Sequence, residues 1–439
     1  MTMASLQQHL EAERCALPPA ARAQPWRGEA FASFNALGLP TRRDERWRYT
    51  DLKPLDNERL SFVPAAPDAE LRAHVAAFLE TQDIDLEGPR LVFIDGHFDA
   101  TLSRRAELPG VTISSLADAW DSFVPEGSTG AAHARSRHPL AALNAAFVQQ
   151  GAVLKLARGV VAAAPIQCVF VTAGRDQAAV QPRIVIELAE AAAATVVQHF
   201  VDAPEAAPGW LNVVTEVSQG PGSSLTVYRL QEHGTEQVHT SLLRARLERD
   251  ARLTTGYVDR GGRLVRNDID VTLAEPGAEA DLFGILLAGG TQHIDNSLCV
   301  DHAAPRTTSL ESFRAIADDR AHAVFCGKVT VRPGAQRIDA RQTSDNLLLS
   351  AKAEIDTKPE LEIYADDVKC THGATVGELD EEQMFYLRSR GVSADAARAL
   401  LTFAFAHITL ERIALPALRE RAIREIAGRL PEGVEWESP

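Results

Sequence analysis

The stretch Leu273-Ala274-Glu275-Pro276-Gly277-Ala278 ends a β-patterned run and enters a turn of small residues. Looser copies of this phrase begin at Leu188, Val217, Leu247 and Val331. With Leu273 included, successive starts lie 29, 30, 26 and 58 residues apart, and 58 is twice 29. Such a period is typical of the stacked coils of a solenoid, because each repeat can bury its apolar stripe only against its neighbours.

The repeating units are strands rather than helix pairs. From about residue 158 to about residue 380, short runs rich in Val, Ile, Leu and Thr alternate with Gly, Pro, Asn and Asp, without a convincing long helix. This pattern favours a mainly β fold with a β-helix core. A β-sandwich also has many short strands, but its turns recur every ~8–12 residues without a longer period.

Composition narrows the class of protein. The chain has 439 residues, 45% of them hydrophobic and 24% charged, with a formal charge of −15, which argues against a nucleic-acid footprint. We find no uncharged apolar run of membrane-spanning length and no apolar core of a signal peptide near the start. The five cysteines form no C-x-x-C pair. These features predict a protein of the reducing cytoplasm.

The regions that flank the β-rich core have different patterns. Residues 1–150 form a mostly helical N-terminal region, with helices near 6–15, 29–37 and 140–149 and a strand with a turn signal at 91–98. The β-helix core covers 151–377, and a C-terminal helical module covers 378–439. The charged segment 42–52 contains Trp47 and Tyr49, and its simplest interpretation is a solvated turn pinned by these two aromatic rings.

The C-terminal module has clear helix signals. Asp380 with Gln383 three residues later predicts a helix start, and Gly391 predicts its end. Ser393 caps a second helix whose expected apolar face contains Leu400, Leu401, Ala404, Phe405 and Ile408. A third helix from about Pro416 places Leu418, Ala422, Ile426 and Leu430 inside and ends at Pro431.

Cys370 and His372 are the candidate chemical residues. They lie two positions apart where the β pattern stops, so on a strand their side chains share a face. Thiolate and imidazole suit iron, zinc or copper(I), but two donors are fewer than the four that a structural zinc or iron–sulfur site usually needs. The pair is therefore part of a site shared with another chain, or Cys370 is a buried thiol. The other four cysteines are expected in the core.

Familiar catalytic motifs are missing. The sequence has neither dinucleotide-binding nor P-loop glycine patterns, and no His-Glu-x-x-His or Gly-x-Ser-x-Gly. A competing class is a β-helix enzyme acting on polysaccharides, which needs carboxylates in a groove. Asp268 and Asp270, which share a strand face, are its best candidates. No aromatic sugar platform accompanies them.

Several motifs together carry a resemblance. The run Cys370-Thr371-His372-Gly373-Ala374-Thr375-Val376-Gly377, followed by 380–392, closely resembles the C-terminal signature of the SufB/SufD family of iron–sulfur cluster assembly proteins, and within it the SufD branch. Arg46-Trp47-Arg48-Tyr49-Thr50-Asp51-Leu52 is similar to the family's N-terminal motif. Ser312-Phe313-Arg314-Ala315 and Gly327-Lys328-Val329 match in the core.

The resemblance implies a right-handed parallel β-helix and a complex with SufB and two copies of the ATPase SufC. It implies that SufC docks on the C-terminal helices, near 379–430, and that SufB pairs near the end of the β-helix. An iron–sulfur cluster is then assembled transiently at that interface, with His372, and less firmly Cys370, as metal ligands from this chain. The isolated chain is expected to hold no cofactor. A homodimer is an alternative assembly when SufB is absent.

Two departures from the SufB pattern indicate the SufD branch of the family. Gly373 stands where SufB carries a glutamate after the histidine, and Ser344 stands where SufB is expected to have a cysteine. Both ligand types are missing, so the chain resembles the partner of the scaffold and is expected to be a subunit without catalytic activity of its own. The SufB scaffold itself remains the alternative.

Overall fold

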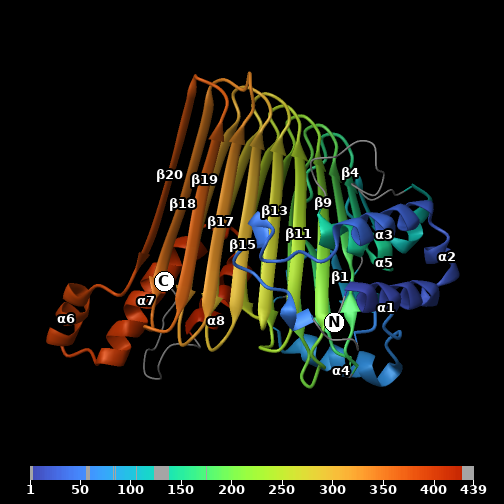
Figure 1. Cartoon of the computed structure of the whole chain (residues 1–439), viewed down its shortest axis with the longest axis horizontal. Helices are drawn as coiled ribbons and strands as arrows, with labels where there is room; N and C mark the ends of the chain where they lie inside the picture. Colours follow the sequence, from blue (N-terminus) through green and yellow to red (C-terminus); the bar gives the residue numbers. More distant parts are fainter. Residues whose placement is uncertain are drawn as a thin grey trace.

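A computed structural model describes residues 3–55, 60–82, 84, 86–104, 106–122, 138–174 and 176–427. Its centre is a parallel β-helix built from two long sheets, as the repeat predicts (Figure 1). We name the sheets after their last strands. The β20 sheet has the order β2-β1-β5-β8-β10-β12-β14-β16-β18-β20, and the β19 sheet has the order β19-β17-β15-β13-β11-β9-β7-β4-β3, with β6 beside β9.

The strands of the β20 sheet are β1 (Arg90–Ile94), β2 (His97–Arg104), β5 (Ile166–Thr172), β8 (Ala193–Asp202), β10 (Ser224–His233), β12 (Arg252–Gly261), β14 (Glu279–Ala288), β16 (Thr308–Ala317), β18 (Ile338–Leu348) and β20 (Val368–Gly377). Those of the β19 sheet are β3 (Val111–Ser115), β4 (Gly151–Leu156), β6 (Ala179–Val180), β7 (Arg183–Leu188), β9 (Trp210–Gln219), β11 (Val238–Leu247), β13 (Leu264–Leu273), β15 (His293–His302), β17 (His322–Val331) and β19 (Glu354–Ile363).

The helices are α1 (Met3–Ala16), α2 (Pro19–Arg22), α3 (Pro25–Leu37), α4 (Ala69–Glu80), α5 (Pro139–Phe147), α6 (Glu381–Ser389), α7 (Ala394–Leu410) and α8 (Pro416–Ala427), with short 3-10 turns η1 (Glu45–Trp47), η2 (Lys53–Leu55) and η3 (Ala117–Ser122). The strands β1 to β3, which lie before residue 150, extend both sheets of the solenoid.

The sheet register explains the period of the sequence. Leu247 pairs with Leu273, Leu273 with His302, and His302 with Val331, so Leu273 and Val331 occupy one ladder position two coils apart. One copy of the repeated phrase, the one predicted to start at Val217, was placed at the wrong residue. The ladder partner of Leu188 and Leu247 is Gln219 rather than Val217. A shift of two residues keeps the side chain on the same face, so the apolar pattern alone could not reveal it.

The interior of the solenoid is a continuous apolar core formed by the inward rows of both sheets. Three phenylalanines, Phe93, Phe170 and Phe200, stack along one row with ring centroids 4.8 and 5.0 Å apart. Parallel strands permit this ladder because equivalent residues of successive coils lie directly above one another. The coil period therefore determines which apolar residues contact one another in the core.

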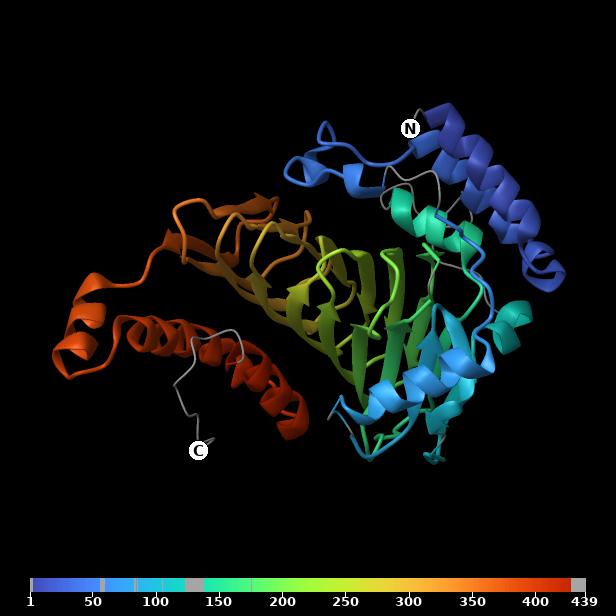
Figure 2. The same cartoon turned by 90° about the horizontal axis from the view of Figure 1, so that it is seen from below.

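The C-terminal helices α7 and α8 cover the outer face of the β20 sheet (Figure 2). Leu410 and Ile426 pack in one buried cluster with Phe283 and Ile285 of β14. The predicted apolar face of α7 was partly wrong, since Ile408 is 55% exposed while Ala406 and Leu410 are buried. In α8 the predicted Leu418, Ala422 and Ile426 are buried, whereas Leu430 and Pro431 lie outside the described residues.

The segment around Trp47 covers the outer face of the β19 sheet, on the opposite side of the solenoid (Figure 2). Trp47 is only 4% exposed, and the Arg266 guanidinium lies 4.6 Å from its ring centroid. Arg266 Nη2 also donates to the Arg46 carbonyl at 2.9 Å. The segment is therefore not a solvated turn held by two aromatics. Trp47 and the buried Thr50 anchor it, and Tyr49 is only half-buried.

We expect Trp47→Ala to lower the free energy of unfolding by about 3–5 kcal/mol, because it removes a buried indole and leaves a cavity beside Arg266. Urea denaturation followed by circular dichroism measures the change. Tyr49→Ala is the control and should cost about 1 kcal/mol or less. Equal losses from both substitutions would support the solvated turn instead.

Candidate functional site

The candidate site lies on the last coil of the solenoid. β20 pairs with β18, and β19 pairs with β17. No strand within the described ranges pairs with the second edge of either one. Each strand is ten residues long, so the coil ends in two unpaired backbone edges. Such edges readily accept strands from another chain.

Cys370 and His372 lie on the inward row of this last coil. In the ladder, Cys370 stands beside Ala340 and His372 beside Gln342, both of which are buried. The two residues therefore share one face, as the spacing predicted. Because no described coil follows, this inward face is open at its end.

The two side chains have different surroundings. Cys370 is half-buried and packs against the cluster of Val329, Val331 and Ile338. Burial, with a smaller effect of the Asp339 carboxylate, raises the pKa of its thiol. His372 is exposed, and the described residues form no hydrogen bond or ion pair with its ring. The imidazole is thus the more available donor of the two.

Sequence reasoning missed the residues behind His372. Glu311, Gln342 and His372 occupy one inward ladder position on β16, β18 and β20. The Gln342 amide donates a hydrogen bond to the Glu311 carboxyl group. Both are about 1% exposed or less. The sequence spacing could have revealed this row. Gln342 precedes His372 by 30 residues and follows Glu311 by 31, and each distance corresponds to one coil.

Glu311 is a buried acid without a cationic partner among its hydrogen bonds in the described structure. Burial raises its pKa to about 7, against the smaller opposing effect of hydrogen bonds from Gln342 and Ser309. The interior behind His372 therefore holds a carboxyl group that gives up its proton less readily than a carboxyl group in water.

Ser344 lies on the inward face of β18 and is buried. Its hydroxyl contacts Asn346, whose amide donates to the Ser344 oxygen at 3.0 Å. In the ladder it stands beside Ala374 of β20, one step along from the pair of Gln342 and His372. Neither residue offers a thiol or carboxylate, so these two positions supply no strong metal ligand.

The carboxylates of the alternative enzyme are already neutralised. Asp268 and Asp270 both accept from Arg46 Nη2, at 3.3 and 2.8 Å. Asp268 also pairs with Arg266 and His138. Burial opposes ionisation, but the Arg266 and Arg46 guanidinium groups and the hydrogen bond from His138 hold the pKa of Asp268 well below its usual range. The pair anchors the N-terminal segment and does not form a catalytic couple.

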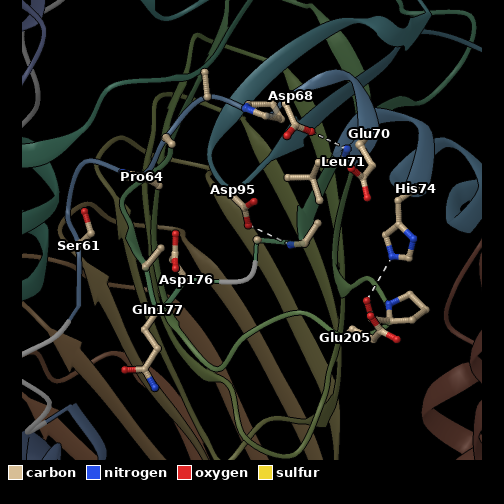
Figure 3. Close-up of a pocket in the computed structure, with 17 residues that line it drawn as sticks. Ser61, Pro64, Asp68, Glu70, Leu71, His74, Asp95, Asp176, Gln177 and Glu205 are labelled. Atoms are coloured by element: carbon tan, nitrogen blue, oxygen red, sulfur yellow. Dashed lines mark hydrogen bonds between the residues drawn. The ribbon is translucent and has the colours of Figure 1, made fainter.

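A separate cavity of about 400 Å³ lies between N-terminal residues and the segments 173–174, 176–178 and 204–205 of the solenoid (Figure 3). Several of its acidic groups have structural partners. Asp68 caps α4 by accepting from Leu71, and Asp95 accepts from the Ala173 amide. His74 contacts the Pro204 carbonyl at 3.2 Å. None of the predicted site residues lines this cavity.

Helix α6 is the other exposed feature near the last coil. It begins at the Asp380 cap, whose carboxylate accepts from the Glu382 and Gln383 amides, as the sequence predicted. None of its residues is buried. Phe385 and Tyr386 are 74% and 58% exposed. In Figure 1 the helix projects away from the solenoid.

Fold and site together define the class: a β-solenoid whose open last coil carries a thiol and an exposed imidazole on one face. Two family models match the chain. The model "SUF system FeS cluster assembly, SufBD core domain" matches residues 170–405, and "SufBD protein N-terminal region" matches 13–168. The chain belongs to the SufBD family of the SUF system of iron–sulfur cluster assembly.

Individual relatives match over more than half of the chain. The iron–sulfur cluster assembly protein SufD of Escherichia coli is 30% identical over 90% of both chains. A SufBD family protein of Synechocystis is 31% identical over 88% of this chain and 87% of its own. The chloroplastic protein ABCI7 of Arabidopsis thaliana is 31% identical over 57% of this chain and 53% of its own. Among the described residues, no helix is long and apolar enough to cross a membrane.

We expect the free energy of unfolding to depend on the charge of Glu311. The unfolded carboxyl titrates near 4.5 and the folded one near 7, so the folded state binds more protons between these values. Stability should therefore fall as the pH rises through this window and level off above it. Glu311→Gln should remove this contribution and be more stable by up to ~3 kcal/mol at pH 8. Urea denaturation of both proteins from pH 5 to 8 measures the difference. Parallel curves would contradict the raised pKa.

Proposed function

We propose that this chain is the non-catalytic partner of the SufB scaffold in a SUF-system complex, and that SufB completes the site on its last coil. The position of His372 and Cys370 carries this proposal. They offer two donors on an inward face that the described chain leaves open. Metal sites of an iron–sulfur cluster usually use four ligands, so a second chain must bring the rest. The cluster is the product of the complex and leaves it.

The last coil has the features of a pairing surface. Besides the two open strand edges, it exposes Ile363 (41%), Tyr364 (61%) and Val376 (44%). A second solenoid that extends the sheets across this end would cover these apolar groups and satisfy the backbone edges. A second copy of this chain could use the same edges when SufB is absent.

Within that interface we assign the ligand role first to His372 and second to Cys370. The exposed imidazole can bind iron without reorganisation. The thiol must lose its proton to become a ligand, and its raised pKa opposes this loss until a metal ion displaces the proton.

Energy must come from a partner, since this sequence has no phosphate-binding loop. We propose that the ATPase SufC binds at α6, where Phe385 and Tyr386 offer an exposed aromatic pair. α6 leads directly into α7, which packs on the β20 sheet. α6 also follows β20 after only residues 378–380, so motion of a bound ATPase can reach the last coil through this direct connection. The five free cysteines fit a site of action in the reducing cytoplasm.

The similarity to Escherichia coli SufD supports the SufD branch over SufB. Gly373 and Ser344 support the same assignment, because the SufB-type glutamate and cysteine are missing at these positions.

We expect His372→Ala to leave the complex with SufB and SufC intact and to lower the yield of assembled cluster at least about tenfold, because one ligand is lost. Co-purification measures the complex, and visible absorbance after supply of iron and sulfide measures the cluster. His74→Ala, an exposed histidine far along the sequence, is the control. Normal assembly by the His372 variant would reject its ligand role.

We expect Phe385→Ala with Tyr386→Ala to weaken binding of the ATPase at least about tenfold, since exposed aromatic residues are frequent hot spots of interfaces. Surface plasmon resonance with immobilised SufC measures this change. Val161→Ala is the control, because Val161 is 69% exposed on a different part of the chain. Unchanged affinity of the double variant would exclude α6 as the docking helix.

A further inference from the structure

Four potential metal ligands meet on the outer face of the β19 sheet, away from the inward face that carries His372. His293, His322 and Glu354 occupy one ladder position on β15, β17 and β19, and Asp356 lies two residues beyond Glu354. His322, Glu354 and Asp356 each place one donor atom within 4.8 Å of the other two. Their hydrogen bonds decide what can bind among them.

His293 presents a lone pair to its neighbour. Its Nε2 lies 2.8 Å from Thr50 Oγ1, and the Thr50 hydroxyl donates its own proton to Asp295. His293 Nε2 must therefore carry a proton and donate it to Thr50, which leaves Nδ1 unprotonated in the neutral ring. Burial, together with the nearby His322, Arg266 and Arg42, lowers the pKa of His293 to about 3 and keeps the ring neutral.

His322 lies between two acceptors. Its Nδ1 is 3.1 Å from His293 Nδ1, and its Nε2 is 2.8 Å from an oxygen of Asp356. A neutral imidazole has one proton and can satisfy only one of these contacts. If the proton lies on Nε2, two nitrogen lone pairs face each other at 3.1 Å. If it lies on Nδ1, the Nε2 lone pair faces a carboxylate.

A divalent cation beside Nε2 resolves this conflict. The proton of His322 then lies on Nδ1 and donates to His293, while Nε2 and the carboxylates of Asp356 and Glu354 bind the cation. A second hydrogen bond that orients the metal-binding histidine is the usual arrangement in metal sites. Here His293 accepts that bond and Thr50 holds His293 in place.

We propose that His322, Glu354 and Asp356 bind a divalent first-row transition metal ion, with His293 as the positioning residue. One imidazole and two carboxylates suit such an ion, and three protein ligands leave positions for water or a further ligand. The two negative charges of the carboxylates balance the charge of a dication. Protonation of His322 would neutralise only one of these two negative charges. The side chains of His322 and Asp356 are 23% and 30% exposed, so an ion can reach them.

The test uses the full-length chain with Co²⁺ as a spectroscopic probe and Zn²⁺ in calorimetry. We expect one equivalent of Co²⁺ to give visible absorption, and Zn²⁺ to displace it. Asp356→Asn and His322→Ala should each weaken binding at least about tenfold, and His293→Phe should weaken it by a similar factor without removing a ligand. Circular dichroism checks that each variant is folded, and Asp356→Asn is the variant with the smallest change of shape.

A variant with both Cys370→Ser and His372→Ala separates this site from the one on the inward face. It should bind Co²⁺ as the unmodified chain does. If the double variant loses Co²⁺ binding, the proposal is overturned. It is also overturned if Asp356→Asn and His322→Ala bind Co²⁺ as tightly as the unmodified chain. If the unmodified chain binds neither Co²⁺ nor Zn²⁺ at pH 7.5, protonation of His322 rather than a metal ion satisfies both of its contacts, and the proposal fails.

Discussion

Stacking of coils through parallel ladders is the interaction on which this structure depends. Each coil buries its apolar residues against the coil on either side, so equivalent positions about 29 residues apart become neighbours. The stack must end, and the last coil has a neighbour on one side only. Its strands β19 and β20 accordingly keep an open edge and a half-covered interior in the described chain. The exposure of His372 is a direct result.

The same ladder assembles polar groups that are distant in sequence. Inside the solenoid it places Glu311, Gln342 and His372 in one row. Outside it places His293, His322 and Glu354 in another. A polar group that is removed from water is costly unless it is hydrogen-bonded. Gln342 bonds to Glu311 in the inner row, and His293 contacts His322 in the outer row.

The terminal regions cover the two outer faces and leave the end of the stack free. α7 and α8 bury the outer face of the β20 sheet, and Trp47 with its neighbours covers part of the β19 sheet. The Trp47 segment also brings Thr50 to His293, so it both protects the sheet and fixes a histidine. The chain thus combines membership of the SufBD family with a solenoid whose last coil is left uncovered in the described structure.

The sequence by itself determined what depends on local pattern: the coil period, the caps at Asp380 and Ser393, and the shared face of Cys370 and His372. Tertiary structure decided the rest. It showed that Gln219 and not Val217 continues the ladder, that Ile408 is exposed, and that Trp47 is buried. It also joined His293 to His322. Alternation fixes which residues share a face, but only the packed neighbour decides which face is covered and which residues of distant coils meet.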